Sequence, residues 1–134
     1  MKDTIKEIKN IKPLYHAKGC TNQDIVNAEK ELSVRFSNEY KEYVREYGAI
    51  SFYGTELSGI NVDSSINVVN MTMEERNLNK DFPDKCYVIE NLRMDGIVVV
   101  EDENGKVYSV QYDKKELICN SFDEYIKMCI LRKE

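Results

Sequence analysis

The sequence has little of several features that would mark a specialised class of protein. Its 134 residues include only two prolines and six glycines, which argues against long disordered linkers. No apolar stretch approaches the roughly 18 residues that a membrane span needs. The first residues contain lysines but no continuous apolar segment, so they do not resemble a secretory signal. We therefore expect a cytoplasmic protein without membrane contacts. We expect it to form a single domain over residues 1–134, with a helix and a connector in 1–20.

Groups that serve catalysis or metal binding are also scarce. His16 is the only histidine, so a histidine metal site or a Ser-His-Asp triad would depend on that one residue. Phosphate-binding loops and nucleophile elbows do not occur. Residues 102–105 (DENG) have the look of a calcium loop, but alignment on the loop glycine puts Val100 at the first ligand position and Gln111 at the twelfth. A plain hairpin explains them better, and we expect no enzymatic activity, cofactor or metal.

The cysteines do not form a recognisable set of ligands or a redox pair. The four are Cys20, Cys86, Cys119 and Cys129. Their spacing matches neither a zinc pair nor a CxxC motif. In a reducing cytoplasm they are expected to be free thiols that pack as small hydrophobic side chains.

Charge is unevenly distributed. The net charge is −5, yet residues 1–20 carry five lysines against two acids. The window 81–105 holds seven acids against Lys85 and Arg93. This sign is wrong for direct binding of nucleic acid, which needs cations against phosphate. It suits a basic protein partner, although a solvated face that keeps the protein soluble is the plain alternative.

Helix signals stand at both ends of the chain. Three isoleucines at a spacing of three predict a short helix over 3–12. Thr21 and Ser37 are placed to cap two consecutive helices, and Gly48 suits the end of the second. Thr72-x-x-Glu75 predicts a helix to about residue 79, and Ser121-x-x-Glu124 opens the last one. The tyrosines of the second helix, at helical spacing, could form a stacking platform for bases, but they are more typical of a core.

The middle of the chain reads as strands. Segments 49–52, 57–62, 66–69, 86–90, 96–101 and 106–112 have strand patterns. Asn104-Gly105 is a strong hairpin signal, because both residues tolerate positive φ. Strands joined by hairpins are antiparallel. The predicted fold is α+β, with an antiparallel-rich central sheet flanked by helices at both chain ends.

The two consecutive helices and the connection between them carry a recognisable motif. Its residues are Ile25, Ala28, Glu29, Leu32, Phe36, Tyr40, Tyr43, Tyr47 and Gly48. They resemble the first motif of the SUKH superfamily, roughly I-x-x-A/F-E-x-x-L-x-x-x-L-P-x-x-Y-x-x-F-x-x-x-N/Y-G. This superfamily includes bacterial immunity proteins and the yeast Knr-type cell-wall regulators. Later elements also resemble the family: Leu57-x-Gly59, Thr72 and Arg76, residues 105–108 (GKVY), and Ser121-Phe122-x-x-Tyr125. Ser37 stands where the family usually has proline, and serine can cap the same turn.

The resemblance covers residues 22–131 and implies a SUKH-like domain that acts by binding. Bacterial members are mostly immunity proteins that neutralise the C-terminal domain of a polymorphic or contact-dependent toxin, often a nuclease or deaminase. The expected partner is such a toxin domain with a basic active-site surface, bound by a monomer or weak dimer. The alternative is a regulatory interaction module like the eukaryotic relatives. The candidate partner-binding residues are Tyr53, Asp81, Asp84, Glu90, Asp95, Glu101, Asp102 and Glu103.

Overall fold

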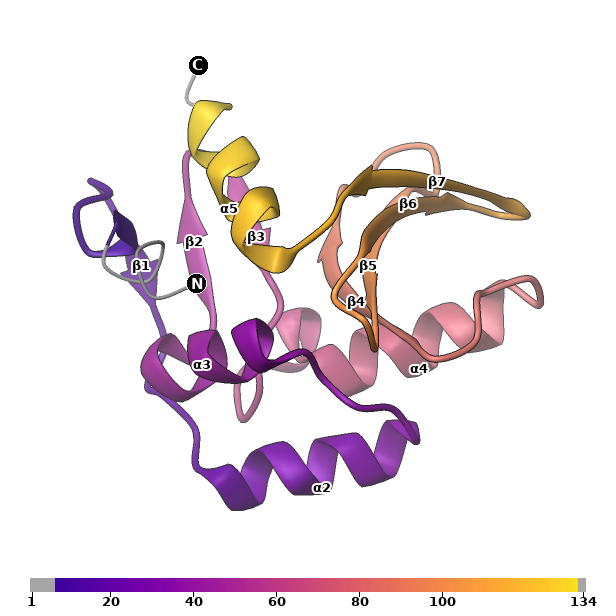
Figure 1. Cartoon of the computed structure of the whole chain (residues 1–134), viewed down its shortest axis with the longest axis horizontal. Helices are drawn as coiled ribbons and strands as arrows, with labels where there is room; N and C mark the ends of the chain where they lie inside the picture. Colours follow the sequence, from indigo (N-terminus) through magenta and orange to yellow (C-terminus); the bar gives the residue numbers. More distant parts are fainter. Residues whose placement is uncertain (1–6, 133–134) are drawn as a thin grey trace.

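The computed structural model describes residues 7–132, which form an α+β domain, as predicted (Figure 1). The helices of this part are α2 (Asn22–Leu32), α3 (Asn38–Tyr47), η1 (a 3-10 turn, Ser64–Ile66), α4 (Val68–Leu78) and α5 (Phe122–Leu131). The strands are β1 (Tyr15–His16), β2 (Ile50–Phe52), β3 (Thr55–Leu57), β4 (Cys86–Asn91), β5 (Val98–Asp102), β6 (Val107–Gln111) and β7 (Lys114–Cys119).

The strands divide between two antiparallel sheets. One has the order β1-β2-β3 and the other β4-β5-β6-β7. They meet next to β3, where the Ser58 N–H donates to the Ile89 carbonyl of β4 at 2.8 Å and the Ser58 hydroxyl donates to the Val88 carbonyl at 2.8 Å. Asn104-Gly105 forms the β5–β6 turn, as predicted.

Strand β4 is buried because it separates two cores. Tyr87 and Ile89 belong to the main core, which includes the aromatic side chains of α3 and α5. Cys86 and Val88 face a smaller cluster that includes Met71 of α4. Alternate residues of a strand point to opposite faces, so a strand covered by helices on both faces shows no polar alternation. Figure 1 shows α4 along one face of this sheet and α2 at the edge of the molecule, below α3.

The predicted caps of three helices are confirmed. The Thr21 hydroxyl accepts a hydrogen bond from the Asp24 N–H, and the Thr21 N–H donates to the Asp24 carboxylate, which completes a capping box. Ser37 accepts from the Tyr40 N–H, and Ser121 caps α5 in the same way. The tyrosine stripe of α3 is buried in the core, as expected. Two of its hydroxyls bond inside the molecule: that of Tyr43 donates to the Ser58 carbonyl at 2.8 Å, and that of Tyr40 lies 2.7 Å from the Ser58 hydroxyl oxygen.

Helix α4 is capped by Asn67, five residues before the predicted cap Thr72, so the strand expected over 66–69 is wrong. Asn67 caps it by accepting from the Val69 N–H at 2.9 Å. Thr72 is instead fully buried, and its hydroxyl accepts from the Val88 N–H of β4 at 3.0 Å. The Thr72 hydroxyl, which the sequence pattern suggests as a helix cap, instead joins α4 to β4. A local pattern cannot reveal a contact of this kind.

The helix expected over 3–12 lies largely outside the described residues. Within them, Ile8 and Ile11 are buried in the main core, so this end of the chain packs onto the domain. Among residues 7–132, no helix is long and apolar enough to cross a bilayer.

Two glycines allow separate parts of the chain to touch. Gly48 ends α3 with a φ of 73°, where L side chains are disfavoured. A Cβ at Gly59 would lie 1.7 Å from the Gly48 carbonyl oxygen, a clash with backbone that no rotamer relieves. The end of α3 and the chain leaving β3 therefore need glycine at their contact.

We expect Gly59→Ala to lower the free energy of unfolding by roughly 3 kcal/mol or more, because overpacking against backbone cannot relax easily. Gly54→Ala is the control: its φ is 83° but no atom lies within 4 Å of the added Cβ, so strain alone costs about 1–2 kcal/mol. Urea unfolding of both variants measures the difference. Equal losses would mean that the close approach at Gly59 does not limit stability.

Candidate protein-binding surface

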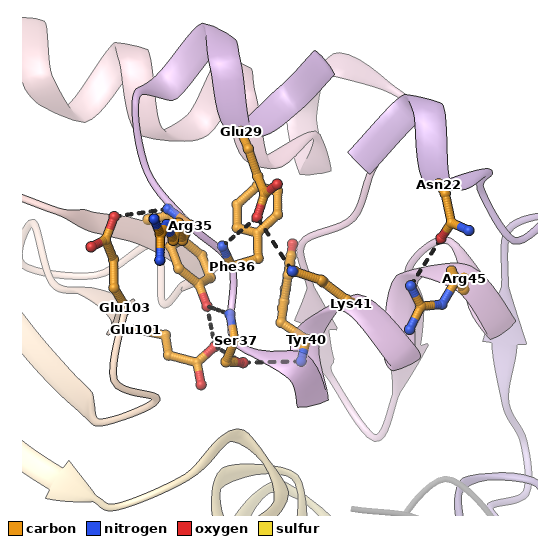
Figure 2. Close-up of polar contacts among 11 residues, drawn as sticks. Asn22, Glu29, Arg35, Phe36, Ser37, Tyr40, Lys41, Arg45, Glu101 and Glu103 are labelled. Atoms are coloured by element: carbon orange, nitrogen blue, oxygen red, sulfur yellow. Dashed lines mark hydrogen bonds and ion pairs between the residues drawn. The ribbon is translucent and has the colours of Figure 1, made fainter. Parts of the chain in front are cut away.

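The joint between α2 and α3 is fixed by the side chain of Glu29. Helix α2 ends at Ser33, whose φ is 55°. The Glu29 carboxylate accepts from the Phe36 N–H at 2.8 Å and lies 3.8 Å from the Lys41 ammonium (Figure 2). One carboxylate thus bonds to the connecting chain and to the next helix.

A second contact joins the far ends of the two helices. The Arg45 guanidinium of α3 donates to the Asn22 side-chain oxygen at 2.9 Å (Figure 2). Since α2 and α3 are joined at both ends, they present a surface of fixed shape.

The joint is also tied to the four-stranded sheet through Glu101. Its Oε1 accepts from the Tyr87 hydroxyl at 2.6 Å and from the Ser37 hydroxyl at 3.1 Å, and the Ser37 N–H donates to the Tyr87 oxygen at 2.9 Å. Burial raises the pKa of Glu101 to about 8, so the carboxyl group is largely neutral at pH 7. Glu101 has no exposed surface, so its carboxyl group serves as an internal contact between the sheet and the joint.

The β5–β6 hairpin lies against the same joint. Glu103 accepts from the Arg35 N–H at 2.8 Å, and the Lys85 ammonium donates to the Ser33 carbonyl at 3.3 Å. Asp102 is occupied within its own turn, where it accepts from the Asn104 and Lys106 N–H groups. The acids predicted to face a partner here therefore also hold the hairpin in place.

Two of the predicted contact residues are not on the surface, and this corrects the sequence-based set. Glu90 is 4% exposed and Glu101 0%. Glu90 bonds to the Tyr125 hydroxyl and forms an ion pair with Arg132 at 3.2 Å, which ties the end of α5 to β4. A carboxylate can be buried where hydrogen-bond donors and a cation replace the contacts it would make with water. Here those partners come from distant parts of the sequence, so the burial of Glu90 could not be predicted from its neighbours.

The remaining candidates do not form one patch. Asp84 is exposed just before β4, at the hairpin end of the sheet. Asp95 is exposed in the β4–β5 connection at the opposite end, and Asp81 follows α4. Tyr53 lies in the β2–β3 turn, half-buried, with its ring 5.5 Å from that of Phe52.

Helix α2 is flanked by two grooves. The first, of about 280 Å³, lies between α2 and the start of α4, and its lining residues are Asp24, Asn27, Ala28, Glu31, Ile60, Asn61, Asn67, Val69 and Asn70. The second, of about 540 Å³, lies at the joint and is lined by Val26, Glu29, Lys30, Ser33, Val34, Arg35, Lys85 and Glu103. The lining of the first groove contains acidic residues and no basic ones, whereas the lining of the second contains both acidic and basic residues. We call the outer face of α2, with both grooves, the α2 surface.

Sequence reasoning missed the acidic groove. Asp24, Asn27 and Glu31 recur at spacings of three and four along α2, which places them on one side of the helix. This spacing can be recognised from the sequence and predicts an acidic side of the helix. The opposite wall includes Asn67 and Asn70, in and beside a segment that was expected to be a strand, so the two walls could not be brought together.

Three of the four cysteine thiols are buried in the part of the chain that the structure describes, and Cys119 is partly exposed. Burial raises the pKa of Cys20 and Cys86 to about 11 and that of Cys129 to about 12, so these thiols stay protonated. His16 is exposed, and its Nδ1 lies 2.8 Å from the Ala17 carbonyl oxygen. No group of three or more potential metal ligands occurs within residues 7–132.

Comparison with protein-family models decides the relationship. The model SUKH_5, described as SMI1-KNR4 cell-wall, matches residues 1–131. The chain belongs to the SMI1-KNR4 family. The match covers essentially the whole chain, so the resemblance carried by the helical joint is confirmed. No curated protein matches this sequence.

The structure shows how motif residues at the joint are held in this SMI1-KNR4 domain. Phe36 lies between Tyr40 and Tyr87, with ring centroids 5.2 and 4.7 Å apart. Glu29 bonds to the Phe36 backbone. Glu29 and Phe36, two of the residues that carry the resemblance, therefore fix the connection between α2 and α3.

We expect the buried acid of this SMI1-KNR4 domain to make stability depend on pH. The pKa of Glu101 is about 8 in the folded state against 4.5 for the ordinary group, so the folded state binds more protons between these values. The free energy of unfolding should fall as pH rises through this interval, by up to roughly 1.4 kcal/mol per pH unit. Below the interval the group is protonated in both states, and above it ionised in both.

Glu101→Gln should remove this slope, because an amide keeps the acceptor oxygen and does not ionise. Urea unfolding across the interval, with Glu116→Gln on exposed β7 as the matched control, measures it. Profiles for Glu101→Gln and the wild type that stay parallel would show that Glu101 does not titrate in this range.

Proposed function

We propose that this chain is an immunity protein. It binds the C-terminal domain of a polymorphic or contact-dependent toxin in the cytoplasm and neutralises it without catalysis. The observation that carries the proposal is membership of the SMI1-KNR4 family over essentially the whole chain, because bacterial proteins of this superfamily are mostly immunity proteins. The burial of Cys20, Cys86 and Cys129 and of Glu101 supports a role in binding rather than in chemistry.

The α2 surface is the proposed contact region. It combines concave shape with a rigid support, since the Glu29 and Arg45 contacts hold α2 against α3. A preorganised surface loses little conformational entropy on binding. Val26, 39% exposed, offers apolar area between polar rims, which is the arrangement of an interface core and its surroundings.

A nuclease domain is the toxin class to test first. A nuclease needs a basic groove for phosphate, and the groove that holds Asp24 and Glu31 has no basic residue in its lining. Complementary charge raises the association rate and favours the correct partner. An acidic groove placed over the basic one would exclude the substrate.

A second candidate function is a regulatory interaction module with an endogenous partner. The matching family model is described by its relation to the cell wall, which favours this alternative. Such a module would bind its partner in cells that carry no toxin gene.

Co-expression with the C-terminal domain of a toxin encoded beside this gene tests the proposal. We expect growth to be rescued and the pair to purify as an equimolar complex. Rescue without a complex would contradict neutralisation by binding. The absence of both, with two folded proteins, would reject that pair and favour the regulatory module.

Surface variants locate the contact. We expect Glu31→Lys to weaken the complex roughly tenfold or more, because like charges would face each other. Glu116→Lys on β7 makes the same charge change away from α2 and should leave affinity unaltered. Val26→Asp tests the groove at the joint in the same way. Affinities unchanged by both α2 substitutions, with rescue retained, would move the interface away from α2 but keep the immunity function.

A further inference from the structure

A small pocket lies at the opposite end of the four-stranded sheet from the helical joint. It has a volume of about 270 Å³ and is lined by Glu75, Leu78, Asn79, Gly96 and Tyr112. These residues come from the end of α4, the β4–β5 connection and the β6–β7 turn. In Figure 1 the end of α4 and the β6–β7 tip lie on the same side of the molecule, away from α2 and α3.

Tyr112 is exposed but held in place. Its side chain is 64% exposed, its φ is 57°, and its carbonyl accepts from the Asn79 amide at 2.8 Å. Its ring lies against Gly96, where a Cβ would come within 3.0 Å of the hydroxyl oxygen. The adjacent Gln111 amide donates to the Asp95 carbonyl at 2.9 Å, which further joins the two turns. The fold therefore presents an aromatic face to solvent in a fixed orientation.

Glu75 supplies a carboxylate without a partner in the same pocket. Within residues 7–132 no side chain forms a hydrogen bond or an ion pair with it, and burial, followed by the charge of Glu74, raises its pKa. The adjacent basic side chain, Arg76, does not pair with Glu75, because its guanidinium donates to the Leu32 carbonyl at 2.9 Å. The pocket therefore contains a carboxylate that a cation from a partner can pair with.

Leu78 adds apolar surface beside these two groups. It is 75% exposed at the last position of α4. The pocket therefore offers a carboxylate, an aromatic face and an aliphatic wall. That combination matches one kind of side chain: a flat cation on a long apolar stem.

We propose that this pocket receives an arginine side chain of a protein partner. The guanidinium lies over the Tyr112 ring and pairs with Glu75, while its methylene stem packs on Leu78. Arginine fits better than lysine because its planar, weakly hydrated head stacks on aromatic faces. The inference does not rest on the toxin proposal, because it concerns a different surface and any partner with an accessible arginine.

Titration with N-acetyl-arginine amide, followed by the backbone amide signals of Gly96, Leu78 and Asn79 in NMR spectra, tests the site. N-acetyl-citrulline amide is the neutral, nearly isosteric control. We expect saturable shifts with arginine and much smaller ones with citrulline. Glu75→Gln and Tyr112→Ala should each weaken binding roughly threefold, the size expected for an exposed charge contact.

Matched controls are Glu116→Gln and Tyr15→Ala, which alter an exposed acid and an exposed tyrosine elsewhere and should leave the titration unchanged. Equal shifts with both amides, no saturable shift, or equal binding by the pocket variants would overturn the proposal. Sedimentation velocity supplies the remaining test. A dimer that Leu78→Asp converts to monomer would overturn it by showing that a second copy covers this pocket.

Discussion

The buried carboxyl group of Glu101 is the contact on which the rest of the arrangement depends. It stands on β5 and accepts from Tyr87 and Ser37, and Ser37 is also the residue that starts α3. The sheet thereby sets where α3 begins, and α3 in turn sets where Tyr43 meets the chain beyond β3. A polar group sealed from water has to keep its partners, so the distance between sheet and helical joint is fixed by chemistry as well as by packing.

Elements whose conformation is set by residues close in the sequence could be predicted from it. Thr21, Ser37 and Ser121 cap helices through atoms three residues away, and Asn104-Gly105 turns the chain through its own backbone preferences. Strand β7 was missed because Lys114, Lys115 and Glu116 lie exposed at the sheet edge and show no apolar alternation. Strand β1 has only two residues and is defined by its pairing with β2, so no local pattern could predict it.

The candidate site was less predictable because its residues are defined by distant partners. Glu90 and Glu101 have the same side chain as Glu103 and stand in the same acidic window, yet the first two are buried and the third is not. The difference comes from Tyr125, Arg132, Tyr87 and Ser37, which no local pattern connects to them. Charge counted along the sequence therefore overstated the acidity of the surface, while the acidic groove beside α2 depended on two walls that only the fold brings together.

The open edge of the four-stranded sheet has a consequence for how the protein behaves when it is abundant. Within residues 7–132 no strand pairs with the outer side of β7, and a row of unpaired backbone groups is a template for adding strands from other copies. Its exposed lysines and glutamate would have to give up water as such a strand approached, and their charges oppose the close stacking that fibrils require. Accumulation of the chain therefore favours dispersed molecules over growing sheets, which suits the proposed role, in which the chain must outnumber its target.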